Sequence, residues 1–121
     1  MPRVTFFEIG VDQTARAKKF YEGVFGWKVT KWEGQPDYWL ITTGQGEPGI
    51  DGALSPRRMP TETTTNTVSV TNVDKSVASI IKHGGKVLVP KVAVPGMGWL
   101  AYCQDTEGNV FGIMQADRTA K

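Results

Sequence analysis

The 121-residue sequence has few of the residues that usually bind transition metals or take part in redox reactions. It contains one cysteine, Cys103, and one histidine, His83. A lone cysteine excludes a disulfide within the chain and is typical of a reducing compartment, so we expect a cytoplasmic protein. No apolar run approaches the ~20 residues of a membrane-spanning helix. Residues 1–10 lack the apolar stretch and cleavage site of a signal peptide. Neither secretion nor membrane association is expected.

The sequence also lacks a concentration of positive charge. There are 14 lysines and arginines against 12 acidic residues, a net charge of +2, and the charges are scattered. Lys18-Lys19 and Arg57-Arg58 are the only basic doublets, which we interpret as solvated surface rather than a nucleic-acid footprint. With 40% hydrophobic residues, the chain is long enough to form one domain with a real core.

Periodicity and turn residues predict two successions of one strand, one helix and three strands. The helices are expected over residues 13–25, capped by Asp12, and 73–83, capped by Asn72. The strands are expected near 3–11, 27–33, 37–43 and 49–54, and then near 65–71, 86–89, 99–103 and 109–115. The organisation is therefore a module over residues 1–54, a linker 55–63, a module 64–116 and a frayed tail 117–121.

The second module repeats the first in its residues. Tyr38-Trp39-Leu40-Ile41 aligns with Gly98-Trp99-Leu100-Ala101 at an offset of 60, and the same offset carries Gly52 onto Gly112. The pair Ile9 and Val11 falls on Val68 and Val70 at an offset of 59. Two copies of one supersecondary unit imply pseudo-two-fold symmetry, so that any site between them would be lined by paired positions.

With this order of elements, the chain resembles the vicinal oxygen chelate superfamily, which includes glyoxalase I, bleomycin-resistance proteins and extradiol dioxygenases. The resemblance rests on four segments: Val11-Asp12, residues 20–27 (FYEGVFGW), residues 84–87 (GGKV) and residues 105–109 (DTEGN). It implies an α+β fold in which two βαβββ modules form an open, eight-stranded half-barrel around a cavity. It also implies that a single-domain chain pairs as a homodimer.

Metal-dependent members of this superfamily take ligands from the first and last strand of each module. Carried onto this sequence, the four positions are Phe6, Gly52, Thr65 and Gly112. None offers the carboxylate or imidazole that a divalent cation requires, and a threonine hydroxyl alone is a weak ligand. We therefore expect no metal and no other cofactor.

The expected cavity offers other candidates. Glu8 shares a strand face with Phe6 and is either a general acid/base and binder of a cationic ligand, or a carboxylate satisfied by a backbone amide or an arginine. Trp39 and Trp99 either stack a flat ligand or belong to the core on the helix side. Gly52 and Gly112 either leave room for a ligand or relieve crowding where the strands curve.

Two further features bear on chemistry. Of Tyr102 and Cys103, only one can face inward, and a buried, inert thiol is the expected state of the cysteine. The loop 91–98, which contains two glycines and a proline, is the candidate lid.

Three functions remain open from the sequence, beside a purely structural role that serves partner binding. The first is a metal-free, homodimeric protein that binds a small organic molecule without catalysis, although capture of a cationic drug such as bleomycin favours a more acidic chain. The second is a metal-independent enzyme with Glu8 as acid/base. The third is a metal-dependent lyase, isomerase or dioxygenase of the superfamily, with ligands elsewhere in the chain.

Overall fold

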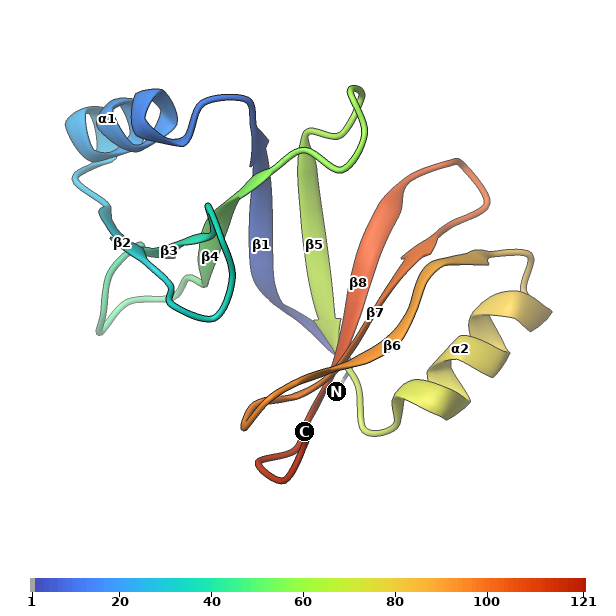
Figure 1. Cartoon of the computed structure of the whole chain (residues 1–121). Helices are drawn as coiled ribbons and strands as arrows, with labels where there is room; N and C mark the ends of the chain where they lie inside the picture. The colour runs from blue at the N-terminus through green and yellow to red at the C-terminus, as the bar shows by residue number, and fades with distance from the viewer. Residues whose placement is uncertain (1) are drawn as a thin grey trace. The chain divides into compact units, whose positions relative to one another are not determined.

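The computed structural model describes residues 2–121 and contains the predicted elements in the predicted order (Figure 1). The α+β class and the duplicated βαβββ order are confirmed. The elements are β1 (Arg3–Val11), α1 (Thr14–Phe25), β2 (Lys28–Lys31), β3 (Trp39–Thr42), β4 (Asp51–Pro56), β5 (Thr64–Ser69), α2 (Val73–Lys82), β6 (Lys86–Val94), β7 (Gly98–Gln104) and β8 (Val110–Ala116).

The chain divides into two compact units. The first unit is residues 6–65, and the second comprises Asn66–Lys121 with the residues up to Thr5. In the first unit the strand order is β2-β3-β4-β1, and in the second it is β5-β8-β7-β6. In each, the first and last strands of the module are parallel and the other pairs are antiparallel.

The core of the first unit lies between α1 and one face of its strands. Its buried residues are Val11, Val29, Ile41 and Leu54. The helix contributes less than its periodicity predicts. The spacing of Ala17, Phe20, Tyr21 and Val24 predicts one apolar stripe, but only Ala17 and Tyr21 pack against this core, whereas Phe20 and Val24 remain 57% and 56% exposed.

The ends of α1 differ in how well they match the sequence. Gly26 closes the helix in the left-handed conformation, with φ of 71°, and its N–H donates to the carbonyl of Glu22. At the other end, the predicted cap Asp12 is wrong. Gln13 occupies the cap position without a side-chain hydrogen bond, and Asp12 instead binds Arg57.

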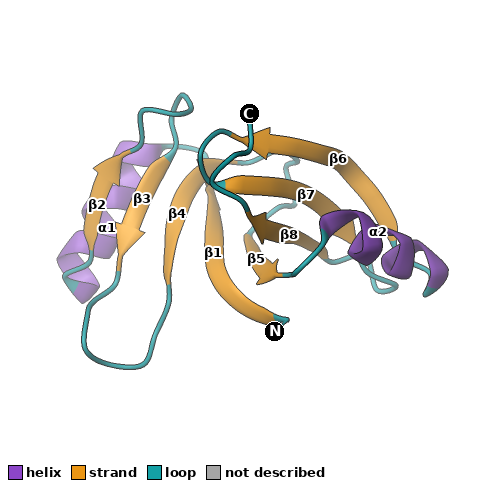
Figure 2. Cartoon of the chain, turned by 90° about the horizontal axis from the view of Figure 1, so that it is seen from below, coloured by secondary structure: helices purple, strands orange, loops and turns teal. Residues whose placement is uncertain are grey.

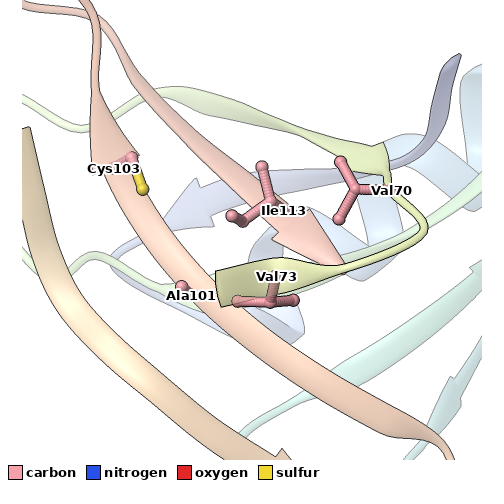
Figure 3. Close-up of a cluster of buried hydrophobic side chains, with 5 residues drawn as sticks. All are labelled: Val70, Val73, Ala101, Cys103 and Ile113. Carbon is pink, nitrogen blue, oxygen red and sulfur yellow. The ribbon is translucent and has the colours of Figure 1, made fainter. Parts of the chain in front are cut away.

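The core of the second unit lies between α2 and the strands beside it (Figures 1 and 2). The buried side chains of this core come from α2, β7, β8 and the residue after β5 and converge on one another (Figure 3); they are Val70, Val73, Ala101, Cys103 and Ile113. The predicted cap Asn72 is confirmed, because its side chain accepts a hydrogen bond from the N–H of Lys75.

Two segments predicted to be irregular are ordered. The candidate lid 91–98 is mostly strand, since β6 runs to Val94 and β7 begins at Gly98. The tail 117–121 is not frayed, because the Asp117 N–H donates to the carbonyl of Met97 and Ala120 is 2% exposed. Within residues 2–121, no helix is long and apolar enough to cross a membrane.

Gly52 lies where β4 passes close to β1. It is paired with Phe7 on β1 and with Ile41 on β3. A Cβ atom at this position would come within 2.5 Å of the Phe7 ring atom Cδ2. Phe7 and Ile41 pack in the α1-side core, so Gly52 faces α1 and not the face that carries Phe6 and Glu8. The predicted cavity position of Gly52 is therefore wrong, whereas the close approach of Phe7 agrees with its interpretation as a relief of crowding.

Substitution of Gly52 tests this close approach. We expect Gly52→Ala to lower the free energy of unfolding by about 1–3 kcal/mol, because the added methyl group overlaps Phe7. A Cβ on Gly49 would meet nothing within 4 Å, so Gly49→Ala should change stability by at most about 0.5 kcal/mol. Urea unfolding of both variants measures the difference, and equal stabilities would contradict the assignment.

Asp117 holds the C-terminal residues through its carboxylate. Hydrogen bonds from the Thr119 hydroxyl, the Trp99 indole and the Thr119 N–H lower its pKa from the ordinary 3.8. A carboxyl whose pKa is lowered by folding stabilises the protein above its unfolded pKa, and this contribution disappears as the pH falls through the lowered value.

Asp117→Asn should therefore lower the free energy of unfolding above pH 3.8 and approach the wild type in more acidic solution. Unfolding measured as a function of pH checks this. Glu47→Gln, at an exposed loop position, serves as the control and should show the wild-type profile. A pH-independent difference for Asp117→Asn would contradict the role of its charge.

Candidate functional site

A buried polar cluster lies in the first unit on the side of the strands away from α1. Glu8 is its centre. Side chains alternate along β1, so that Phe7 and Ile9 pack toward α1 while Phe6 and Glu8 face the other way. Glu8 is 4% exposed and is paired with Ala53 on β4. A carboxylate this deeply buried requires polar partners.

Tyr38 provides the first of these partners. Its hydroxyl donates to Oε2 of Glu8 at 2.6 Å. Tyr38 stands directly before β3, and its ring packs edge-on against Trp32 with the centroids 5.5 Å apart. The Trp32 N–H donates to the Tyr38 carbonyl, so the residues between them form a closed turn. Asp37 in this turn has φ of 56°, a left-handed conformation that aspartate tolerates.

Arg58 provides the positive charge of the cluster. Its Nη2 atom lies 3.6 Å from Oε1 of Glu8 and 2.8 Å from Oε2 of Glu62. The same atom donates to Oγ1 of Thr65 at 3.3 Å, and Nε donates to Glu62 at 2.9 Å. Glu62 is 8% exposed, whereas the Arg58 side chain is 31% exposed. The cluster thus places one cation between two buried carboxylates.

The segment between β4 and β5 is fixed to the end of β1, and this positions Arg58 and Glu62. The Gly10 N–H donates to the Thr63 carbonyl at 2.6 Å. The Arg57 guanidinium binds both the Asp12 carboxylate and the Glu62 carbonyl. A Cβ at Gly10 would lie 3.0 Å from that carbonyl oxygen, so glycine is what allows the segment to lie this close.

The structure therefore brings together two of the predicted site residues. Glu8 and Thr65 meet at Arg58, and Thr65 is 1% exposed. Arg58 lies 3.6 Å from Glu8, which agrees with the alternative in which an arginine satisfies this carboxylate. Sequence reasoning missed Tyr38, Arg58 and Glu62. The Arg57-Arg58 doublet, interpreted as solvated surface, was the available signal, but nothing local indicated that the second arginine turns inward.

Both predicted tryptophans belong to the cores on the helix side. Trp39 packs against the core of the first unit, and Trp99 against that of the second. Their placement in a cavity is wrong, and so is their equivalence. Trp39 on β3 pairs with Leu54 on β4. Leu54 pairs with Ile9 in the first unit, and Ile113 pairs with Val68 in the second, so Leu54 and Ile113 occupy equivalent positions. Ile113 pairs with Ala101, so the counterpart of Trp39 is a residue two positions beyond Trp99.

Gly112 does lie on the side of its unit away from α2. A Cβ on it would come 3.1 Å from Oγ1 of Thr67 and 3.3 Å from the Tyr102 ring. Thr67 pairs with Gly112 as Glu8 pairs with Ala53, so the true counterpart of Gly112 is Ala53. The offset of 60 had linked Gly112 to Gly52, and it is wrong by one residue. A shift of one residue along a strand moves a side chain to the opposite face of the sheet.

Cys103 is buried in the helix-side core, as expected, and Tyr102 lies on the other face. Burial raises the pKa of the Cys103 thiol, which disfavours the thiolate form that nucleophilic chemistry requires. The inert role predicted for this cysteine agrees with its surroundings.

Two open hollows lie beside the helices. One of about 390 Å³ runs between α1 and the end of β1, with Arg16 and Phe20 at its rim. Another of about 330 Å³ lies beside α2 and is lined by Val68, Ile80 and Phe111 among others. Neither of these two hollows is lined by Glu8, Tyr38 or Arg58, so both are separate from the buried polar cluster.

The four positions implied for a metal do not fit one. Phe6 and Gly112 have no donor side chain, Gly52 faces α1, and the Thr65 hydroxyl accepts a hydrogen bond from a cation. In the described part of the chain, residues 2–121, no three histidine, cysteine or acidic side chains gather into a potential metal site. No chemical step is therefore assigned to a metal.

Comparison with known proteins bears on the identity of this fold. Residues 3–44 match the family described as bleomycin resistance protein-like N-terminal. Among curated proteins, none matches the chain in sequence.

Solved structures match over nearly the whole chain. A glyoxalase/bleomycin resistance protein/dioxygenase superfamily member from Vibrio splendidus 12B01 has 14% identity and a TM-score of 0.68, covering 97% of this chain and 100% of its own. A Streptomyces coelicolor methylmalonyl-CoA epimerase variant, in complex with 2-nitronate-propionyl-CoA, has 15% identity and a TM-score of 0.69, covering 100% and 99%. The Mycobacterium tuberculosis methylmalonyl-CoA epimerase has 13% identity and a TM-score of 0.65, and the match covers 94% of this chain and 87% of the epimerase.

At these identities the structural likeness shows the fold alone. The architecture, the order of the elements and the match over residues 3–44 agree on one fold. The chain has the fold of the glyoxalase/bleomycin resistance/dioxygenase group, the vicinal oxygen chelate superfamily that its sequence resembles.

Proposed function

We propose that this protein binds a small organic molecule without a metal, through the strand face that carries Phe6 and Glu8. The observation that carries the proposal is the buried Glu8 carboxylate, held between Tyr38 and Arg58 on the face that α1 leaves uncovered. A buried carboxylate is costly unless it is paired and hydrogen-bonded, so Glu8 is not there for packing alone. We expect the protein to act as a homodimer in the cytoplasm.

The charges in the cluster indicate which ligands to expect. Two carboxylates, Glu8 and Glu62, lie beside the Arg58 guanidinium. These three side chains together carry a formal charge of −1, although the whole chain carries +2. A ligand with a cationic or hydrogen-bond-donating group is favoured over an anionic one, because it complements the excess negative charge.

Calorimetry tests the binding proposal. The panel contains bleomycin, neutral flat aromatic drugs and methylmalonyl-CoA, and we expect binding by a cationic or neutral member. Glu8→Gln keeps the shape of the side chain but removes its charge, and it should weaken that binding about tenfold or more. Tyr21→Phe, which alters a hydroxyl in the α1-side core, should leave the affinity unchanged.

If no compound of the panel binds, the proposal is contradicted. Equal affinities of the wild type and Glu8→Gln would remove Glu8 from the site. Circular dichroism of each variant distinguishes lost binding from lost folding.

A second candidate function is acid/base catalysis by Glu8. It is favoured by the structural likeness to methylmalonyl-CoA epimerases, which are enzymes. The contacts of Glu8 count against it, because Tyr38 engages one of its oxygens and Arg58 lies beside the other. Proton transfer would require one of these contacts to open toward the substrate.

Incubation with methylmalonyl-CoA in D₂O, followed by NMR, tests the catalytic candidate. If Glu8 transfers the proton, the wild type should incorporate deuterium at the carbon next to the thioester, and Glu8→Gln should lose this activity while it stays folded. Absence of exchange in the wild type would count against an epimerase-like reaction. Unchanged exchange in the variant would exclude Glu8 from it.

A further inference from the structure

Three oxygen atoms from different parts of the first unit converge on one nitrogen atom. The Nη2 atom of Arg58 lies 2.8 Å from Oε2 of Glu62, 3.3 Å from Oγ1 of Thr65 and 3.6 Å from Oε1 of Glu8. Glu8 and Thr65 are on β1 and β5, and Glu62 is in the segment between β4 and β5. All three oxygen-bearing residues are at most 8% exposed.

This convergence involves a position at which the superfamily resemblance implies a metal ligand. Thr65 is one such position, and Glu8 is two residues along β1 from Phe6, another. Phe6 and Glu8 share a strand face. The Arg58 guanidinium therefore contacts one implied ligand position, Thr65, and a residue two positions along β1 from another.

Two buried carboxylates require a compensating positive charge. An isolated buried carboxylate is strongly unfavourable, whereas one that is paired and hydrogen-bonded is tolerated. Carboxylate and hydroxyl oxygens are also the donors that hard divalent cations take, with water completing the coordination. A guanidinium satisfies the same oxygens with N–H donors and delivers its charge without any ion from solution.

We propose that Arg58 is a built-in cation that takes the place of a metal ion in this unit. While the guanidinium is present, its charge and volume exclude a divalent cation from the oxygens of Glu8, Glu62 and Thr65. Removal of the guanidinium leaves these oxygens as a site for a hard divalent cation. This inference does not depend on the proposed binding of an organic ligand.

Titration with Mn²⁺, followed by electron paramagnetic resonance and by thermal unfolding, tests the inference. The wild type should not bind the ion at this site, and its unfolding temperature should not respond. Arg58→Ala should bind Mn²⁺ with an affinity about tenfold or more above that of the wild type, and the ion should raise its unfolding temperature. Equal responses of the two proteins would overturn the proposal.

Two variants make the test specific. Arg118→Ala removes an exposed arginine of the second unit, away from the converging oxygens, and it should gain no Mn²⁺ binding. Glu8→Gln combined with Arg58→Ala should lose the gained affinity, because one of the two carboxylates is gone. Retention of the affinity in this double variant would show that the ion binds elsewhere.

Arg58→Ala is expected to be destabilised, since it removes the guanidinium that contacts two buried carboxylates. If it does not fold alone, it is refolded with Ca²⁺ and, in parallel, with NaCl at the same ionic strength. Recovery of folded protein with Ca²⁺ only would support the proposal. Failure in both salts, while Arg58→Lys folds, would contradict it, because the site would then accept an organic cation but no metal ion.

Discussion

The buried charge of Glu8 is the constraint around which the first unit is organised. An uncompensated carboxylate in the interior costs several kcal/mol, of the order of a domain's whole stability. Tyr38 and Arg58 compensate it, and they come from segments far from Glu8 in the sequence. Each segment is held in turn: Trp32 orients Tyr38, and Glu62 orients Arg58.

The neighbouring arginines at 57 and 58 remain partly exposed, with side chains 28% and 31% accessible, but each also makes contacts that a surface interpretation of the pair does not predict. Arg57 joins the end of β1 to the segment 57–63 through Asp12 and the Glu62 carbonyl. This attachment lets Arg58 reach inward to Glu8. The close approach depends on Gly10, which leaves room for the Glu62 carbonyl. A motif of two basic residues cannot carry this information, because the partners are fixed by tertiary contacts.

The sequence predicted the order of the elements well, but it predicted less well which residues face each other across the strands. Alternation placed Glu8 away from the α1-side core, and Asn72 was recognised as a cap, because both effects act over a few residues. The errors at Gly52, Trp39 and Trp99 have another origin. A repeat alignment fixes side-chain direction only if it is exact, since a shift of one residue reverses the face. The strand pairings show that β4 aligns with β8 at an offset of 59, the same offset that aligns β1 with β5.

The sequence by itself determined the duplicated βαβββ modules, the superfamily resemblance, the face of Glu8 and the absence of ordinary ligand side chains at the four implied positions. These depend on local periodicity and on residue chemistry. Only the tertiary structure decided that Glu8, Glu62 and Thr65 meet at Arg58, and that both tryptophans pack toward the helices. The physical reason is that strand register and the path of residues 57–63 are set by contacts between segments distant in the chain.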